Sequence, residues 1–223
     1  VVISTVNLQV KQKGEIKMNH SLILDIGKTN VKLHLLDENR KSVFSESRAN
    51  NIVTKGPYPH ADVDGIFDWM MSVCQRLCAQ FHITAISVTT HGATAALINC
   101  NSDASSNGLI LPVLDYEYSA IASSEYDDIK PDFSESLSPK LPAGLNLGRQ
   151  LYWLQKRFPE AFSKCTDILM YPQYWVWRLT GERCTEVTSL GCHTDLWAPL
   201  TNDYTNMVKE LGWLDLLPPI VPA

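Results

Sequence analysis

The first part of the chain alternates between apolar and polar residues in a way that is typical of strands. Residues 21–26 (SLILDI) form a short apolar run and predict a buried strand that enters a tight turn. Residues 31–36 (VKLHLL) alternate as a half-buried strand does, and residues 42–48 predict a third strand. Together these segments predict an antiparallel meander whose first turn spans residues 27–30.

A helical period follows the meander. Apolar residues recur three or four positions apart, and Asp62 or Asp64 can cap a helix that we expect to continue through Phe81. The apolar positions of this period are Val63, Ile66, Phe67, Met70, Cys74, Leu77, Cys78 and Phe81. Residues 83–90 (ITAISVTT) then predict another strand. A helix between two strands is a crossover connection, so we expect this strand to pair in parallel with an earlier one.

The segments that follow mix strands with helices. Residues 94–99 and 109–114 predict a second hairpin around the polar loop 101–108. Residues 150–158 and 172–179 predict helices that are rich in Trp and Tyr. Aromatic residues at helical spacing are usually structural, so we interpret them as core or interdomain packing. They are Tyr152, Trp153, Tyr174, Trp175 and Trp177.

The last part of the chain ends on a predicted helix. Gly181 follows the preceding helix at the position that a C-cap prefers, and residues 206–217 predict the final helix, which stops at Pro218 and Pro219. Strands first, then a crossover helix, then further strands and helices predict a layered α/β domain.

The composition is that of a folded domain. Of 223 residues, 45% are hydrophobic and 9% are aromatic, which is enough to build a core and excludes disorder. The formal net charge is −5 and no run of Lys and Arg occurs, which argues against a nucleic-acid partner. No apolar run approaches the roughly 18 residues needed to cross a bilayer, so we expect no membrane partner.

The cysteines and the N-terminal residues bear on metal binding, cellular compartment and the start of the domain. None of the six cysteines forms a Cys-x-x-Cys pair, which argues against a structural zinc site, and we interpret them as reduced core thiols of a cytoplasmic protein. Residues 1–17 are polar and lack the apolar block of a signal peptide. We expect Met18 to be the natural start, with residues 1–17 as an extension and residues 18–223 as the domain.

The turn between the first two predicted strands is the sharpest candidate for chemistry. Glycine allows backbone N–H groups to approach a phosphate closely, hydroxyl and amide side chains add donors, and lysines add positive charge. A carboxylate at the strand end can orient Mg²⁺ through water. The residues concerned are Asp25, Gly27, Lys28, Thr29, Asn30 and Lys32. The alternative interpretation is a plain hairpin turn, because Asp and Gly are common turn residues.

Two further segments have candidate sugar ligands. His91 and Gly92 follow the strand that ends the crossover, where ligands of α/β sheets gather. Asp115 and Glu117 stand beside two tyrosines, and carboxylates accept hydroxyl protons while rings stack on the C–H faces of a polyol. For His91 the alternative is an ordinary core or surface histidine whose hydrogen bonds are satisfied. For the two carboxylates the alternative is an acidic surface loop. His193 and Asp195 could form an acid/base pair, but no nucleophile lies nearby in sequence, so we set that interpretation aside.

In order and spacing, these segments resemble the FGGY carbohydrate kinases of the actin-like ATPase superfamily. LDIGKTNVKL resembles the opening phosphate-binding hairpin of that family, and VTTHGATAALI resembles the segment that reads Gln-Met-His-Gly-Ala-Thr in xylulokinase-like members. YPQYWVWRLTGERCTEVTSLGCHTDLW and WLDLLPPIVPA resemble two later family segments. The resemblance covers residues 21–223, and the shared order of its motifs argues against coincidence.

The resemblance implies a ribonuclease H-like α/β domain, a mixed sheet flanked by helices. It also implies ATP-dependent phosphorylation of a ketose or polyol hydroxyl, with ATP and Mg²⁺ as cofactors and a small-molecule sugar as partner. The hairpin would face phosphate and metal, with Asp25 acting on Mg²⁺ through water. His91, Gly92, Asp115 and Glu117 would face the sugar.

This sequence departs from the family pattern at two places. The family usually has Trp-x-Asp-x-Arg where residues 115–119 read DYEYS, so Glu117 stands in for the aspartate and the arginine is absent. The usual Gln before the substrate segment is replaced by Thr89 or Thr90. Both changes leave the identity of the sugar open. The sequence also leaves open which hydroxyl is phosphorylated and whether the protein forms a homodimer.

The resemblance places the general-base aspartate beyond Ala223, and it places the adenine site in a C-terminal domain that is absent from this chain. Phosphoryl transfer depends on positioning and charge stabilisation in a complete site, so we expect this chain alone to be inactive. Two alternatives remain at this point. One is another member of the actin-like ATPase superfamily, and the other is a non-catalytic sugar-binding or interaction domain.

Overall fold

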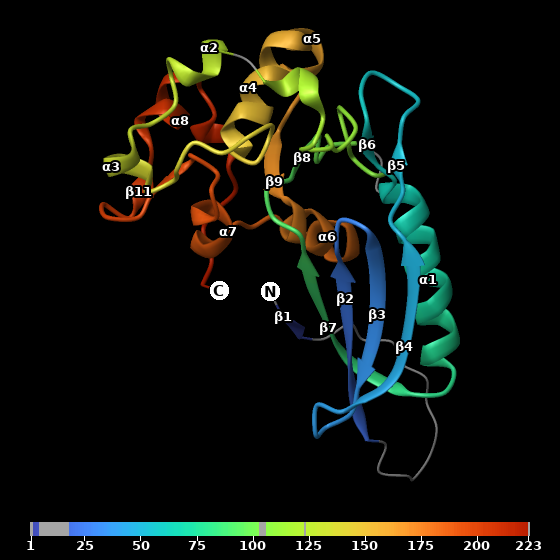
Figure 1. The fold of residues 1–223 in the computed structure, drawn as a ribbon. Coiled ribbons are helices and arrows are strands. Elements are labelled where there is room, and N and C mark those ends of the chain that lie inside the picture. The colour runs from blue at the N-terminus through green and yellow to red at the C-terminus, as the bar shows by residue number, and fades with distance from the viewer. Residues whose placement is uncertain (1, 5–17, 103–105, 123, 223) are drawn as a thin grey trace. The chain divides into compact units, whose positions relative to one another are not determined.

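The structure is a computed structural model that describes residues 2–4, 18–102, 106–122 and 124–222. The chain divides into two compact units. Figure 1 draws the fold with a colour that runs from blue at the N-terminus to red at the C-terminus. The first unit contains the described residues up to Asn51 together with Asp62–His91. The second contains Ile52–Ala61 together with the described residues from Gly92 onward. Of the predicted extension, residue 1 and residues 5–17 lie outside the described residues.

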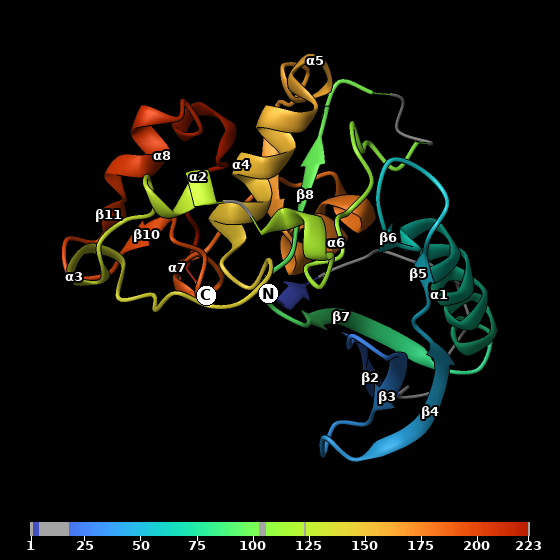
Figure 2. The same cartoon turned by 45° about the horizontal axis from the view of Figure 1, so that its top comes forward.

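The first unit is built on a five-stranded mixed sheet with the order β1-β7-β2-β3-β4 (Figures 1 and 2). Its strands are β1 (Val2–Ser4), β2 (Asn19–Ile26), β3 (Asn30–Leu36), β4 (Ser42–Ala49) and β7 (His82–Thr90). The pairs β2–β3 and β3–β4 are antiparallel, and β7 pairs in parallel with β2. The predicted meander and the predicted crossover are therefore confirmed.

The meander has one apolar face because its alternation matches across strands. Leu24 is opposite Leu33, Ile26 is opposite Val31, and all four side chains are fully buried. Residues that are paired in register point to the same face of a sheet, so this face forms the core of the first unit.

Helix α1 (Val63–Cys78) covers this apolar face. Arg48 of β4, which is opposite Val31, pairs with Asp62 at 3.0 Å and donates to the carbonyl of Gly65. Arg76 near the other end of α1 pairs with Glu46 of β4 at 2.8 Å. These contacts hold the helix beside β4, and Figure 1 shows the two elements next to each other.

The helix begins as predicted and ends earlier than predicted. Asp62 caps it by accepting the Gly65 N–H at 3.0 Å. The last helical residue is Cys78 rather than Phe81, because the chain turns after Leu77 to enter β7 at His82. Its buried stripe is Val63, Ile66, Met70, Val73 and Leu77, which adds Val73 to the predicted positions.

The second unit has short strands and many short helices. Its strands are β5 (Ile52–Val53), β6 (His60–Ala61), β8 (Ala95–Ile98), β9 (Asp167–Met170), β10 (Trp197–Ala198) and β11 (Asp203–Tyr204). Its α-helices are α2 (Ser124–Asp127), α3 (Phe133–Ser136), α4 (Leu147–Arg157), α5 (Pro159–Phe162), α6 (Tyr171–Thr180), α7 (Val187–Gly191) and α8 (Asn206–Glu210). Single 3₁₀ turns occur at Ser119–Ile121 and Leu214–Leu216.

The predicted hairpin of residues 94–99 and 109–114 is present only as a short antiparallel contact, with two backbone hydrogen bonds from Asn99 N–H to the Gly108 carbonyl and from Ile110 N–H to the Leu97 carbonyl. Strand β8 pairs along its length with β9 in antiparallel fashion, whereas the second predicted segment contributes an isolated bridge between Ile98 and Leu109. Pro112 has no N–H to donate to a ladder, which disfavours a strand there. A partner from far along the chain completes the pairing instead.

The predicted helix over residues 206–217 is also wrong in extent. Helix α8 stops at Glu210, and Gly212 adopts a left-handed conformation with φ 72°. This turn directs Trp213 into the core, where it is fully buried. The two aromatic helices are confirmed as α4 and α6, with Gly181 at the left-handed C-cap of α6 (φ 79°).

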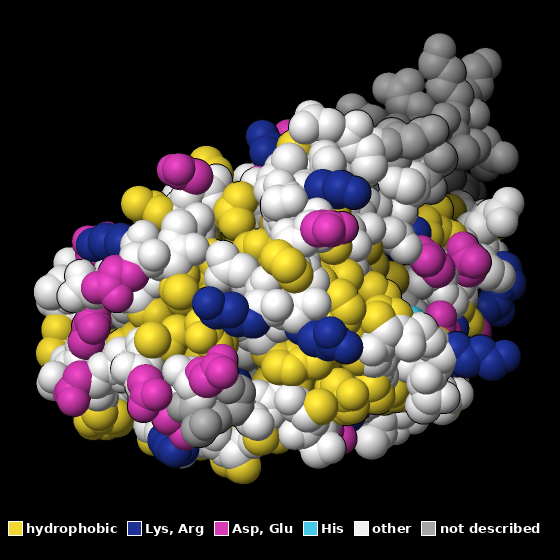
Figure 3. Space-filling model, turned by 90° about the horizontal axis from the view of Figure 1, so that it is seen from above, with side chains coloured by type: hydrophobic (Ala, Val, Ile, Leu, Met, Phe, Trp, Pro, Cys, Tyr) yellow, Lys and Arg dark blue, Asp and Glu magenta, His cyan; other side chains and the backbone are white. Residues whose placement is uncertain are grey.

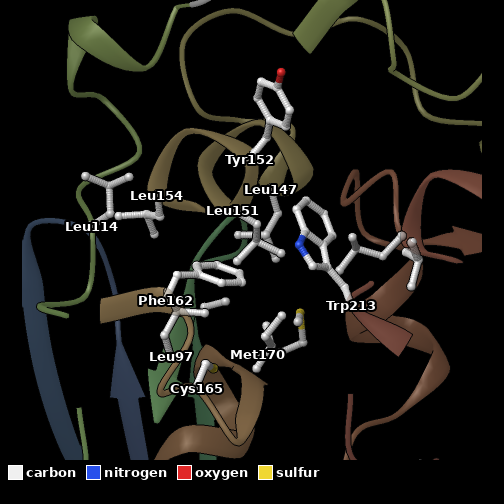
Figure 4. Close-up of a cluster of buried hydrophobic side chains, with 14 of the residues drawn as sticks. Leu97, Leu114, Leu147, Leu151, Tyr152, Leu154, Phe162, Cys165, Met170 and Trp213 are labelled. Atoms are coloured by element: carbon white, nitrogen blue, oxygen red, sulfur yellow. The ribbon is translucent and has the colours of Figure 1, made fainter. Parts of the chain in front are cut away.

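The core of the second unit is a mixed aliphatic and aromatic cluster, drawn in Figure 4. Leu147 and Leu151 of α4 point toward Trp213, with Phe162 and Met170 beside them. Of the predicted packing aromatics, Tyr152, Tyr174 and Trp175 are buried, which confirms that interpretation for them.

On the face drawn in Figure 3, basic and acidic side chains are interspersed. Within the described ranges, no helix is both long and apolar enough to span a membrane.

Candidate functional site

A row of polar side chains crosses the face of the first sheet that is opposite α1. Asp25 of β2 is in register with Lys32 of β3 on one side and with Thr89 of β7 on the other. Lys32 is in turn opposite Ser47 of β4. Paired residues share a face, so the order Thr89, Asp25, Lys32, Ser47 brings a carboxylate, an ammonium group and two hydroxyls together. Asp25 is half-buried and the other three are exposed.

Two members of this polar row were not predicted as site residues. Ser47 and Thr89 were assigned to strands, and the period of two along those strands was the signal that could have placed them on the face of Asp25. Each sequence motif covers one strand with its turn, and the row becomes visible only when four strands are aligned in register.

The turn at the end of β2 needs its glycine. The Gly27 N–H donates to the carbonyl of Asn30 at 2.9 Å and closes the turn. A Cβ atom added at Gly27 would lie 3.1 Å from that same carbonyl oxygen, which is tighter than ordinary contacts. Thr29 and Asn30 are exposed at the tip, where the Asn30 amide donates to the Thr29 hydroxyl at 3.2 Å. Lys28, which lies between Gly27 and Thr29, is half-buried.

His91 adjoins this turn through its backbone. Its N–H donates to the carbonyl of Ile26 at 2.8 Å, which continues the parallel pairing of β2 and β7 beyond the last strand residue. The side chain is half-buried. The structure therefore brings His91 and the predicted phosphate residues to the same end of the first sheet.

The other predicted sugar ligands belong to the second unit. Asp115 is half-buried, and its carboxylate accepts the backbone N–H of Glu117 at 3.2 Å. The Asp115 N–H donates to the carbonyl of Pro59 at 3.0 Å, and Glu117 is exposed. One carboxylate oxygen of Asp115 thus stabilises its own turn, which leaves Glu117 as the more accessible acid of the pair.

The segment after Gly92 is held in a strained conformation. Ala93 has φ 52°, a left-handed conformation that is uncommon for a residue with a Cβ atom. The side chain of Gln150 donates to the carbonyls of Ala93 and Gly144, each at 2.6 Å. Strained backbone that its surroundings hold in place is typical of binding segments, so this observation favours a functional interpretation of the Gly92 region.

The acid/base pair of His193 and Asp195 finds no support in the geometry. Asp195 is 1% exposed, and both of its carboxylate oxygens are engaged. Tyr126 donates to one at 2.7 Å, while Asn146 and Lys130 approach the other at 3.2 and 3.1 Å. These contacts give the Asp195 carboxylate a structural role, and the side chain of His193 is exposed to solvent.

Comparison with known proteins gives a consistent family match. The sequence model for the N-terminal domain of the FGGY family of carbohydrate kinases matches residues 20–221. An L-fuculokinase from Salmonella typhi is 27% identical over 184 residues, which cover 78% of this chain and 38% of that protein. A probable L-xylulose kinase from Pasteurella multocida is 25% identical over 224 residues, which cover 92% of this chain and 44% of that protein.

Solved structures agree on the fold. A carbohydrate kinase from Novosphingobium aromaticivorans superposes with a TM-score of 0.84 at 34% identity, and the match covers 93% of this chain and 43% of that protein. A xylulose kinase from Lactobacillus acidophilus superposes with a TM-score of 0.76 at 21% identity, covering 92% and 42%. The predicted α/β fold of the actin-like ATPase superfamily is confirmed. The chain spans less than half the length of these relatives.

Proposed function

Because the chain belongs to the FGGY family of carbohydrate kinases, we propose that its protein transfers the γ-phosphate of Mg·ATP to a hydroxyl of a ketose or polyol. This chain would supply the N-terminal half of the enzyme. The general base and the adenine site would come from a C-terminal domain, which is the second partner in this proposal besides the sugar. The free cysteines suit a reducing compartment, and we place the protein in the cytoplasm.

The end of the first sheet is suited to phosphate and metal. The Gly27 requirement supports this fit, because a Cβ atom would crowd the Asn30 carbonyl oxygen at 3.1 Å and disturb the turn that carries these backbone N–H groups. We propose that Gly27, Lys28, Thr29 and Asn30 hold phosphate oxygens through backbone and side-chain donors. When bound, Mg·ATP supplies the phosphoryl group and the cation that offsets its charge.

Asp25 and Lys32 complete this part of the proposal. Their side chains are neighbours on one face of the sheet, so a carboxylate that attracts hydrated Mg²⁺ lies beside an ammonium group that attracts phosphate. Asp25 would act on the metal through water. This pairing of opposite charges at the end of β2 is the observation that carries the proposed function.

The sugar would be bound by His91, Gly92, Asp115 and Glu117. His91 has a ring that can donate to or accept from a hydroxyl, and its backbone fixes it to the end of β2. Asp115 and Glu117 offer carboxylate oxygens, which accept protons from polyol hydroxyls.

The test is sugar-dependent release of ADP by the full-length protein. We expect activity with one or more members of a ketose panel that includes L-fuculose and L-xylulose, because similar proteins are named for kinases of these sugars. We expect His91→Ala to raise the sugar KM by about tenfold while the KM for ATP changes little, because one hydrogen bond to the sugar is lost.

His82→Ala is the matched control, since His82 is an exposed histidine at the opposite end of β7. This control should leave both KM values unchanged. An unchanged sugar KM in His91→Ala would remove His91 from the sugar site. Sugar binding by calorimetry without ATP turnover would favour a sugar-binding protein, and ATP hydrolysis without any sugar dependence would favour another actin-like ATPase.

A further inference from the structure

Asn50 directly follows β4 and is only 8% exposed. Its side-chain amide donates to the carbonyl of Gly27 at 2.7 Å, and its backbone N–H donates to the carbonyl of Thr29 at 2.9 Å. One residue therefore binds two alternate carbonyls of the turn between β2 and β3. The neighbouring Asn51 is exposed.

These two hydrogen bonds determine where the turn points its donors. In a trans peptide the N–H is directed opposite to the C=O of the same plane, and the described chain contains no cis peptide bond. The carbonyls of Gly27 and Thr29 are directed toward Asn50. The N–H groups of the next residues, Lys28 and Asn30, are consequently directed away from Asn50.

The side chain of Asn50 is not arranged for maximum stability. Its orientation is fixed because the Gly27 carbonyl can only accept, so the NH₂ group must face it. The amide oxygen is then buried without a hydrogen-bond partner among the described residues, which costs free energy. What the arrangement provides in return is a turn with a fixed backbone orientation.

We propose that Asn50 is a positioning residue that holds the Gly27–Thr29 turn in its phosphate-binding conformation. It would act through the two carbonyls and without touching the nucleotide. The assignment of a ligand to this turn rests on the proposed function, whereas the hold of Asn50 on the turn rests on the hydrogen bonds alone. The two parts can therefore be tested separately.

The first test is hydrogen exchange of the full-length protein without nucleotide. In Asn50→Ala we expect the amides of Gly27 and of position 50 to exchange about tenfold faster, since the turn loses one of its two ties to this position. The amides of Leu24 and Leu33 in the centre of the sheet should keep their rates. That contrast distinguishes a loosened turn from a loosened domain.

The second test is steady-state kinetics with the same variants. We expect Asn50→Ala to raise the KM for ATP by about tenfold and to leave the sugar KM unchanged, because the phosphate donors are no longer preorganised. A loss of folded protein alone would lower the apparent kcat without separating the two KM values. Asn51→Ala is the matched control, and it should behave as the unsubstituted protein in both tests.

Asn50→Asp covers the case in which the alanine variant does not fold. It keeps the shape of the side chain and replaces the donor with an oxygen that repels the Gly27 carbonyl, so we expect the same faster exchange at the turn. Unchanged exchange at Gly27, or faster exchange with an unchanged KM for ATP, would overturn the positioning role. Absence of ATP-dependent activity in the unsubstituted protein would overturn the proposed function, and the exchange data alone would then decide whether Asn50 holds the turn.

Discussion

The two units of this chain are stabilised by different kinds of interaction. In the first, β2 has a long backbone ladder on each side, and its buried face consists of aliphatic side chains such as Leu24 and Val31. In the second, the strands are short and buried polar side chains such as Asp195 and Gln150 tie loops together. Periodic backbone pairing therefore builds the first unit, whereas specific side-chain contacts shape the second.

The largest effect should come from Asp195, at the centre of the polar contacts of the second unit. Asp195→Ala leaves Lys130 nearly buried without its carboxylate and removes the acceptor of Tyr126. We expect the free energy of unfolding to fall by about 4 kcal/mol, as measured by urea denaturation, because a broken buried ion pair leaves an uncompensated charge.

The control for this variant is Asp203→Ala, which removes a carboxylate from an exposed pair with Lys209 and should change stability little. Asp195 has φ 64°, a conformation that Asn tolerates better than Ala, so Asp195→Asn should fall between these two variants. Equal stability of Asp195→Ala and Asp203→Ala would contradict the view that buried polar contacts stabilise the second unit.

These contacts also show why the second unit was hard to predict. Tyr126 and Asp195 are 69 residues apart, and nothing in the sequence between them marks the pair. The partner of β8 was likewise missed, because β9 lies beyond several helices and its four residues carry no alternation of their own. A sequence pattern reports local periodicity, and contacts between distant loops leave no such signal.

The first unit was predictable for the opposite reason. The alternation of β3 and the apolar run of β2 follow directly from one buried face, and Asp62 marks the start of α1. The candidate turn was found from its glycine, but Asn50 was missed because an Asn-Asn pair after a strand looks like an ordinary turn. Its role depends on the fold bringing it back to Gly27.

A smaller effect is expected from the aliphatic core of the first unit. Leu24→Ala removes a fully buried side chain from the central part of β2. We expect the free energy of unfolding, measured by urea denaturation, to fall by about 3 kcal/mol, because apolar burial is lost and a cavity remains. Leu200→Ala is the matched control, because Leu200 is 75% exposed and the same atoms are removed from a solvated position. A loss for Leu24→Ala as small as that for Leu200→Ala would mean that the sheet is held by its ladders alone.

The smallest effect is expected from a single buried charge in the second unit, that of Glu186. Glu186 caps α7 and accepts the backbone N–H groups of Thr188 and Ser189 at 2.7 and 2.6 Å. Burial alone would raise the pKa of the Glu186 carboxyl, but the donors from Ser189 and Thr188 outweigh it, and the pKa lies below its ordinary value. The charged form is therefore favoured in the folded chain.

The sign of the pH dependence follows from that direction. Because the folded pKa lies below the unfolded one, the stabilisation is complete above the ordinary pKa of 4.5 and is lost as the pH falls through the folded value. We expect Glu186→Gln to lower the free energy of unfolding by about 1 kcal/mol at neutral pH, because a neutral amide oxygen accepts more weakly than a carboxylate. Urea denaturation at successively lower pH should show this difference shrink in acid. Glu210→Gln, at an exposed position, should show no such convergence, and a difference for Glu186→Gln that stayed constant with pH would mean that its carboxylate charge does not stabilise the cap.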